Sequence, residues 1–304
     1  MYDCIIIGTG PAGLSAALNL KTYKKSFVWF GSKNLSDKVQ KAEKITNYPG
    51  FPELTGQELF SHFTDHIQSA GLDITEKTVT NVMSVGTYYM VLADNEVYEA
   101  KTLILAMGVM TAKLLKGEDE LLGRGVSYCA TCDGAFFKEK TVVVVGGGNM
   151  AVEDAIFLSR ICKKVYLVHR RDELRADQVL QESLIACENV EIIWNSVAVE
   201  IQGEECVTGL KIRNMQDNTE SEIETDGVFI AVGIIPNTDK FRNLVKLDEA
   251  GYIIAGEEGI TGTPGVFVAG DIRTKMLRQV VTAVSDGANA VTSAHNYLIS
   301  AFHN

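Results

Sequence analysis

Two cysteines separated by two residues, Cys129 and Cys132, are the side chains in this chain whose spacing points most directly to chemistry. Two sulfurs at this spacing can close the small disulfide ring that takes part in thiol–disulfide exchange. A zinc site would normally draw on a second pair of this kind, and the sequence contains none. The spacing therefore predicts a redox-active dithiol and no metal.

Glycine-rich turns flank the dithiol on both sides. Upstream, Gly8-Thr9-Gly10-Pro11-Ala12-Gly13 follows an apolar run at 4–7, and downstream, Gly146-Gly147-Gly148-Asn149-Met150-Ala151 follows an apolar run at 141–145. Strand, glycine turn and helix in this order form the dinucleotide-binding fingerprint, in which a helix N-terminus faces a pyrophosphate. The sequence therefore predicts an α/β protein with two Rossmann-like dinucleotide-binding domains.

The residues after the second strand of each unit differ in charge. An acid about 20 residues beyond the glycines usually binds a ribose 2′-hydroxyl, but the first unit has Gly31-Ser32-Lys33 there, so Ser32 and Lys33 become the nearest candidates. The second unit has His169-Arg170-Arg171 and then Arg175. Guanidinium groups at this place favour a 2′-phosphate and hence NADP, with His169 flanking them. The alternative is a solvated basic surface.

Two further features concern acidic residues. A strand at 265–271 ends in Asp271, at the sheet edge where ligands of open α/β folds collect, and this carboxylate is a natural acceptor for ligand hydroxyls. Glu153 and Asp154 are adjacent on the helix after the second glycine turn. Adjacent helical residues point in different directions, which argues against a catalytic pair of carboxylates. We therefore expect both side chains to face solvent.

Composition limits the classes of function. A chain of 304 residues, 46% hydrophobic and 22% charged, fits about two globular domains. The formal charge of −11 argues against nucleic acid or an anionic membrane as partner. No apolar run reaches the ~18 residues of a membrane span. The scattered Cys4, Cys162, Cys187 and Cys206 are expected to be reduced packing residues, which is typical of a cytoplasmic enzyme.

Taken together, the motifs resemble those of the bacterial low-molecular-weight thioredoxin reductases over nearly the whole chain. The matching segments are 8–13, Asn47-Tyr48-Pro49-Gly50, Cys129-Ala130-Thr131-Cys132-Asp133-Gly134, 146–151, 169–171, 231–238, Gly270-Asp271 and Arg278-Gln279. The resemblance implies FAD at the first turn, NADPH at the second, a thioredoxin-like partner and a homodimer. It also implies that an NADPH domain (114–243) is inserted into the FAD domain (1–113 and 244–304).

The same resemblance assigns roles to individual residues. Cys132 would face the flavin, Cys129 would attack the partner disulfide, and Asp133 would act as general acid, with a helix N-cap as its alternative role. The implied FAD-binding residues are Gly8, Gly10, Pro11, Ala12, Gly13, Ser32, Lys33, Lys38, Asn47, Gly108, Asp271, Arg278, Gln279 and Val280. The implied NADPH-binding residues are Gly148, Asn149, Met150, Ala151, His169, Arg170, Arg171, Arg175 and Gly233.

The chain departs from the family pattern in two places. Met150 stands where relatives usually carry Thr, and Leu35-Ser36-Asp37-Lys38 stands where they commonly carry Gly-Gly-Gln. The second segment is similar to a clostridial subgroup that includes ferredoxin-dependent flavin thioredoxin reductases, which have lost the NADPH motifs. This chain keeps those motifs, which favours NADPH as donor. Reduced ferredoxin as donor and a flavin-dependent dithiol oxidase are the alternatives.

Overall fold

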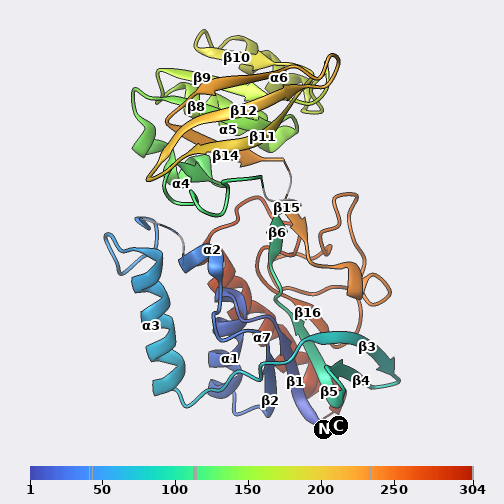
Figure 1. The fold of residues 1–304 in the computed structure, drawn as a ribbon. Helices are drawn as coiled ribbons and strands as arrows, with labels where there is room; N and C mark the ends of the chain where they lie inside the picture. The colour runs from blue at the N-terminus through green and yellow to red at the C-terminus, as the bar shows by residue number, and fades with distance from the viewer. Residues whose placement is uncertain (41, 43, 112–114, 233, 303–304) are drawn as a thin grey trace. The chain divides into compact units, whose positions relative to one another are not determined.

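The structure is a computed structural model that describes residues 1–40, 42, 44–111, 115–232 and 234–302 (Figure 1). The chain divides into two compact units, Met1–Met110 with Ile235–Asn304, and Thr111–Ile234. We expected the inserted segment to end at residue 243, but residues 235–243 belong to the first unit. The physical reason is packing, because Phe241 is buried in the same core as Leu105.

The first unit contains a six-stranded sheet in the order β2-β1-β5-β4-β3, with β16 paired to β5. Strands β1, β2, β5 and β16 are parallel, whereas β3, β4 and β5 form an antiparallel meander. The elements are β1 (Tyr2–Ile7), α1 (Pro11–Thr22), β2 (Phe27–Phe30), α2 (Asp37–Gln40), α3 (Gly56–Ser69), β3 (Val79–Val85), β4 (Tyr88–Ala93), β5 (Glu96–Leu105), the 3-10 turn Asp239–Phe241, β16 (Val266–Val268) and α7 (Val280–Phe302). The short strands β6 (Val109–Thr111) and β15 (Ile234–Pro236) pair with each other.

Alternating residues of β1 supply both faces of this sheet, as the period of a strand requires. Cys4 and Ile6 are buried in a core with α1 and α7, and Ile5 and Ile7 are buried on the other face with residues of β4 and β5. Figure 1 shows α1 and α7 side by side along the sheet. The continuous apolar run of β1 therefore follows from burial on both faces.

The second unit contains a five-stranded, all-parallel sheet in the order β10-β9-β8-β14-β7 and an antiparallel sheet β11-β12-β13. Its elements are β7 (Val126–Ser127), α4 (Ala130–Asp133), the 3-10 turn Gly134–Phe137, β8 (Thr141–Gly146), α5 (Asn149–Ser159), β9 (Lys164–Val168), α6 (Gln178–Ile185), β10 (Val190–Ile193), β11 (Ser196–Gly203), β12 (Val207–Asn214), β13 (Glu220–Glu224) and β14 (Gly227–Ala231).

Alternating residues of β8 contribute to a separate hydrophobic core on each face of this parallel sheet. Val142 and Val144 are buried in a core with Ala155 of α5, whereas Val143 and Val145 are buried in a core with the antiparallel sheet. Both faces of the central strand are thus covered, as parallel sheets require. None of the helices in the described part of the chain has the length and apolar character needed to cross a bilayer.

Helices α1 and α7 approach each other more closely than side chains would permit. A Cβ atom added to Gly287 of α7 would lie 2.2 Å from the backbone oxygen of Ala12 and 2.8 Å from Cβ of Ser15. We predict that Gly287→Ala lowers the free energy of unfolding. Overpacking costs about 1 to 3 kcal/mol, and it acts against a backbone atom that cannot turn aside. That cost exceeds the gain of at most about 1 kcal/mol in helix propensity.

Urea unfolding of the holoprotein measures this effect. Gly256→Ala is the matched control in the same unit, because an added Cβ there meets only the flexible carboxylate of Glu258 at 3.2 Å. Equal stability of Gly287→Ala and the wild type would mean that the helices separate without cost.

The expectation that Glu153 and Asp154 both face solvent is wrong for Asp154, which is partly buried, whereas Glu153 is exposed. Burial, followed by the charge of Glu153, raises the pKa of Asp154 from its ordinary value of 3.8 to about 7. A folded-state pKa above the unfolded value adds stability at low pH that is lost as the pH rises through about 7. Asp154 therefore destabilises the second unit in alkaline solution.

We predict that Asp154→Asn is stabilised relative to the wild type at pH 8 by up to about 4 kcal/mol, and that the difference disappears towards pH 4. Urea unfolding at both pH values measures it. Glu188→Gln, which removes an exposed carboxylate elsewhere in the same unit, serves as the control. A difference between Asp154→Asn and wild type that does not change with pH would contradict the burial argument.

Candidate active site

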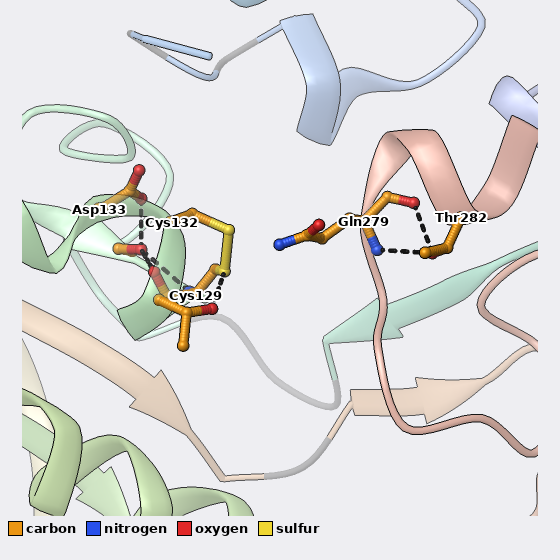
Figure 2. The surroundings of a disulfide bond; sticks show 7 residues. Cys129, Cys132, Asp133, Gln279 and Thr282 are labelled. Carbon is orange, nitrogen blue, oxygen red and sulfur yellow. Dashed lines mark hydrogen bonds between the residues drawn. A yellow bond between two sulfur atoms is a disulfide. The ribbon is translucent and has the colours of Figure 1, made fainter. Parts of the chain in front are cut away.

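The dithiol lies at the beginning of a short helix in the second unit. Cys129 and Cys132 form a disulfide with their Cα atoms 5.3 Å apart, which Figure 2 shows beside Asp133. Cys129 is the residue before α4, in an extended conformation, and its backbone oxygen accepts hydrogen bonds from the N–H groups of Cys132 and Asp133. The tight turn thus holds the two sulfurs at bonding distance, and the predicted disulfide is present.

A serine that belongs to none of the predicted motifs connects the dithiol to Asp133. The hydroxyl of Ser127 accepts a hydrogen bond from the backbone N–H of Cys129 at 3.0 Å and donates one to Oδ2 of Asp133 at 2.5 Å. Ser127 is buried at the end of β7, next to the partly buried Asp133. This arrangement orients the Asp133 carboxyl with respect to the disulfide turn. A lone serine shortly before a Cys-x-x-Cys motif carries no sequence signal of this role.

Two glycines of the first turn are required by packing. A Cβ on Gly8 would lie 2.2 Å from the backbone oxygen of Ala106, and a Cβ on Gly13 would lie 2.0 Å from that of Gly8. The indole N–H of Trp29, 2.9 Å from the same Gly8 oxygen, fixes the turn from β2. Gly10 differs, because no atom lies within 4 Å of a Cβ added there, and its φ of −65° suits any residue.

Other predicted residues of the first unit surround this turn. The hydroxyl of Thr9 donates to the backbone oxygen of Ser32 at 2.8 Å, which brings the end of β2 to the glycine turn. A Cβ on Gly270 would lie 2.9 Å from Cβ of Ala12, which places the segment leading to Asp271 beside the start of α1.

Gln279 and Val280 form the beginning of α7, where Thr282 exchanges hydrogen bonds with the backbone of Gln279 (Figure 2). Arg278 lies over the ring of Tyr252 at 4.2 Å, and its Nε donates to the backbone oxygen of Asp271 at 3.3 Å. Arg278 therefore lies beside Asp271, and Gln279 and Val280 lie at the N-terminus of α7.

A buried ion cluster supports the loop that carries Asp271. The carboxylate of Asp286 on α7 accepts two hydrogen bonds from Arg273, at 2.7 and 2.9 Å, and one from Lys275 at 2.9 Å. It also accepts one from the backbone N–H of Gly270 at 3.0 Å. Burial acts to raise the pKa of Asp286, but the hydrogen bonds and charges of Arg273 and Lys275 together lower it below its ordinary value. The sequence signal for this cluster is Asp286, an acid on an otherwise apolar face of α7. The sequence-based prediction did not include it.

The second glycine turn also combines closely packed glycines with one open glycine. A Cβ on Gly146 would lie 2.5 Å from the backbone oxygen of Ala231 and 2.6 Å from Cβ of Ala151. A Cβ on Gly147 would lie 2.1 Å from Nδ1 of His169. Gly148 has no atom within 4 Å of an added Cβ, and its φ of −97° suits any residue. In each turn, therefore, contacts with protein atoms explain every glycine except the open one.

His169 holds the second turn against the loop that bears the arginines. Its ring is buried, and Nε2 lies 3.0 Å from the backbone oxygen of Glu173. Burial is the main cause that lowers the pKa of His169. The charges of Arg175 and Arg170 add to it against backbone hydrogen bonds that raise the pKa, so the neutral form of the ring is favoured. The backbone N–H of Arg175 donates to the oxygen of Gly147 at 2.8 Å. The side chains of Arg170, Arg171 and Arg175 are exposed beside this turn.

The remaining predicted residues have simpler surroundings. Asn149 and Asp177 exchange two hydrogen bonds, at 2.8 and 2.9 Å, and Met150 is exposed at the start of α5. Asn47 is exposed in a loop, and Gly108 has a left-handed φ of +62° with open space around it. Gly233 and the side chain of Lys38 lie outside the described residues. The cysteines Cys4 and Cys162 are buried, but Cys206 is exposed, so the expectation that it packs in a core is wrong.

Comparison with known proteins places the chain in a family. Residues 2–287 match the pyridine nucleotide-disulphide oxidoreductases. The chain is 42% identical to a thioredoxin reductase of Listeria monocytogenes over 300 residues, which cover 98% of this chain and 94% of that protein.

Two solved structures are informative. A thioredoxin reductase from Streptococcus pyogenes has a TM-score of 0.91 at 40% identity and covers 99% of both chains. A ferredoxin-flavin thioredoxin reductase from Clostridium acetobutylicum has a TM-score of 0.54 at 37% identity and covers 98% of both chains. The predicted α/β class with two dinucleotide-binding domains is confirmed. With this match and the redox disulfide in place, the chain belongs to the pyridine nucleotide-disulphide oxidoreductase family.

Proposed function

We propose that the protein is a thioredoxin-disulfide reductase that passes electrons from NADPH through FAD and the Cys129–Cys132 dithiol to a thioredoxin-like protein. The observation that carries the proposal is a Cys-x-x-Cys disulfide in the same chain as two dinucleotide turns. Thioredoxin reductases of this family use FAD and NADPH, and the similarity to them extends over nearly the whole chain.

The two open glycines support the presence of two dinucleotides. Gly10 and Gly148 have ordinary backbone angles, and no protein atom would touch an added side chain. The fold alone therefore does not require glycine at either place, whereas a pyrophosphate approaching the backbone at a helix N-terminus does. We assign FAD to the turn at Gly10 and NADPH to the turn at Gly148. In the first unit, Asp271 directly follows Gly270, which lies beside Ala12, and we assign to its carboxylate the role of acceptor for ligand hydroxyls.

When bound, FAD and NADPH supply the transfer of hydride and electron pairs that reduces the disulfide. The chain's own chemistry is thiol exchange. The Cys129 thiolate attacks one sulfur of the partner's disulfide, which forms a mixed disulfide and releases one partner thiolate. The Cys132 thiolate then attacks Cys129, which restores the Cys129–Cys132 disulfide and releases the second partner thiolate. The roles of the two sulfurs follow the family resemblance.

Asp133 is suited to handle the proton of this exchange. Each released thiolate must gain a proton, and a carboxyl group near the dithiol can supply one. The hydrogen bond from Ser127, which also receives the Cys129 N–H, orients that carboxyl. We therefore propose Asp133 as general acid and Ser127 as the residue that positions it.

The arginine loop favours NADPH over ferredoxin as donor. Arg170, Arg171 and Arg175 are exposed on a loop that the buried His169 holds against the second turn. Guanidinium groups at this place recognise a 2′-phosphate. The similarity to the ferredoxin-flavin thioredoxin reductase of Clostridium acetobutylicum keeps reduced ferredoxin as the second candidate donor. A flavin-dependent dithiol oxidase would have no use for these arginines.

We also infer a homodimer from the family resemblance and a cytoplasmic location. The location is supported by four cysteines that remain outside the disulfide. Sedimentation equilibrium tests the homodimer, and fractionation of the producing cells tests the location.

Replacing either sulfur should stop turnover without loss of flavin. We predict that Cys129→Ser and Cys132→Ser each reduce thioredoxin reduction to background, because exchange needs both thiols, while FAD remains bound. NADPH consumption with a thioredoxin and the flavin absorbance of the purified variants measure the two effects. Cys206→Ser, which removes an exposed cysteine outside the disulfide, is the control. Wild-type turnover by either variant would exclude the relay.

Substitution of the open glycines should separate the two nucleotides. We predict that Gly10→Ala loses FAD and keeps NADPH affinity, and that Gly148→Ala loses NADPH affinity and keeps FAD, both without loss of fold. Each variant is the control for the other. Flavin content, NADPH titration and circular dichroism measure the outcome. Loss of secondary structure in either variant, or the opposite pattern of ligand loss, would contradict the assignment.

The exposed arginines should distinguish NADPH from NADH by binding the 2′-phosphate. We predict that Arg170→Ala or Arg171→Ala weakens NADPH binding roughly tenfold to a hundredfold, because a charge-assisted hydrogen bond contributes about 1.5 to 3 kcal/mol. NADH binding should change little. Arg213→Ala, an exposed arginine of β12 in the same unit, is the control. Parallel titrations with NADPH and NADH measure both, and equal losses for the two nucleotides would contradict recognition of the phosphate.

A further inference from the structure

A cavity of about 430 Å³ opens in the first unit beyond the ends of β1 and β2. Its lining includes Gly8, Gly31 and Ser32, together with two acids, Glu76 and Asp94. The cavity therefore begins at the first glycine turn and continues past the end of β2, where dinucleotide folds place the adenosine half of their ligand. The acid that usually binds the ribose there is missing, because residues 31–33 are Gly-Ser-Lys.

The segment before β3 brings a carboxylate to this position. Thr75 pairs with Phe30 in a parallel bridge, its N–H donates to the oxygen of Trp29 at 2.8 Å, and its oxygen accepts from the N–H of Gly31. Glu76 follows directly. Its Oε1 accepts a hydrogen bond from the backbone N–H of Lys33 at 3.3 Å, and its Oε2 lies 3.5 Å from Nζ of Lys33. The carboxylate of Glu76 thus lies beside residue 33, although the chain reaches it from another segment.

The other charged side chains that line the cavity already have structural partners. Oδ1 of Asp94 accepts from the N–H of Thr78 at 3.1 Å, which connects the turn between β4 and β5 to the residue before β3. Lys77 pairs with Glu96, and Lys240 donates to the oxygen of Val79 at 3.1 Å. Glu76, by contrast, is held by a half-exposed pair with Lys33, and exposed pairs of this kind contribute little and rearrange easily. A carboxylate has about four acceptor positions, so room remains for a hydroxyl.

We infer that Glu76 replaces the missing acid of the first fingerprint and accepts the hydrogen bond of the adenosine ribose 2′-hydroxyl of FAD. The inference rests on the proposed assignment of FAD to the first unit. Glu76 binds the ligand through its side chain, and Lys33 positions the carboxylate. The ribose 2′-hydroxyl takes no part in redox chemistry, so this contact acts on flavin affinity and leaves the thiol exchange unchanged.

A cycle of one variant and one ligand analogue tests the contact. The probes are FAD and an FAD analogue with 2′-deoxyadenosine, and flavin fluorescence gives the dissociation constant of each for the deflavinated protein. The wild type should bind the deoxy analogue roughly tenfold to a hundredfold more weakly than FAD, as expected for a hydrogen bond to a charged group. Glu76→Gln should bind FAD more weakly than the wild type and distinguish the two flavins by a smaller factor, because its amide oxygen is an uncharged acceptor.

Two further variants make the result specific. Glu249→Gln, an exposed acid of the same unit outside the cavity lining, should discriminate like the wild type. Asp94→Asn should also keep the discrimination. If Glu76→Gln discriminates like the wild type, or if Asp94→Asn alone abolishes the difference, the inference is overturned while FAD binding stands. If the wild type binds neither flavin, the proposed function itself fails. Circular dichroism of each variant confirms that it is folded.

Discussion

Both halves of this protein depend on the close approach of backbone atoms at a glycine turn. At the first turn, the Gly13 position lies so near the Gly8 carbonyl that a single carbon would be 2.0 Å from the oxygen. At the second, Gly146 lies similarly close to Ala231 and Ala151. These contacts bring the beginning of a helix against the end of a strand and direct unpaired N–H groups outward. The open glycine of each turn, Gly10 or Gly148, then leaves space beside the backbone for a ligand.

The supporting interactions are different in the two units. In the first, the buried Asp286 binds Arg273, Lys275 and the Gly270 N–H, so one carboxylate ties α7 to the loop that bears Asp271. In the second, the neutral ring of His169 fills the space against Gly147 and carries the arginine loop. Removing a buried charge partner is costly, whereas a packed neutral ring costs little electrostatically. The exposed Arg170, Arg171 and Arg175 lie on the loop that this ring supports.

Local patterns predicted much of this architecture. The apolar runs at 4–7 and 141–145, each followed by glycines, correspond to β1 and β8, and the predicted disulfide is present. Contacts between distant segments could not be predicted in this way. Glu76 lies beside Lys33 because Thr75 pairs with Phe30, and Ser127 lies beside Asp133 because β7 ends at the dithiol turn. Neither pairing has a spacing or composition signal.

Burial of charge was the other property that the sequence did not reveal. Asp154 and Asp286 look alike as acids on helices, yet burial raises the pKa of the first, and donors from Arg273 and Lys275 lower that of the second. The difference depends on whether a donor from another segment reaches the carboxylate. A periodic pattern can place an acid on a helix face, but it cannot supply that donor.

The passage of electrons from NADPH through FAD to the Cys129–Cys132 disulfide is the step on which the proposed function depends. An anaerobic titration with NADPH, followed by flavin absorbance and by alkylation of newly formed thiols, tests it most directly. We predict that the wild type takes up one electron pair for the flavin and one for the disulfide, and that Cys129 and Cys132 become alkylated. A flavin that NADPH leaves oxidised while reduced ferredoxin bleaches it, or a bleached flavin with the disulfide intact, would contradict this electron path.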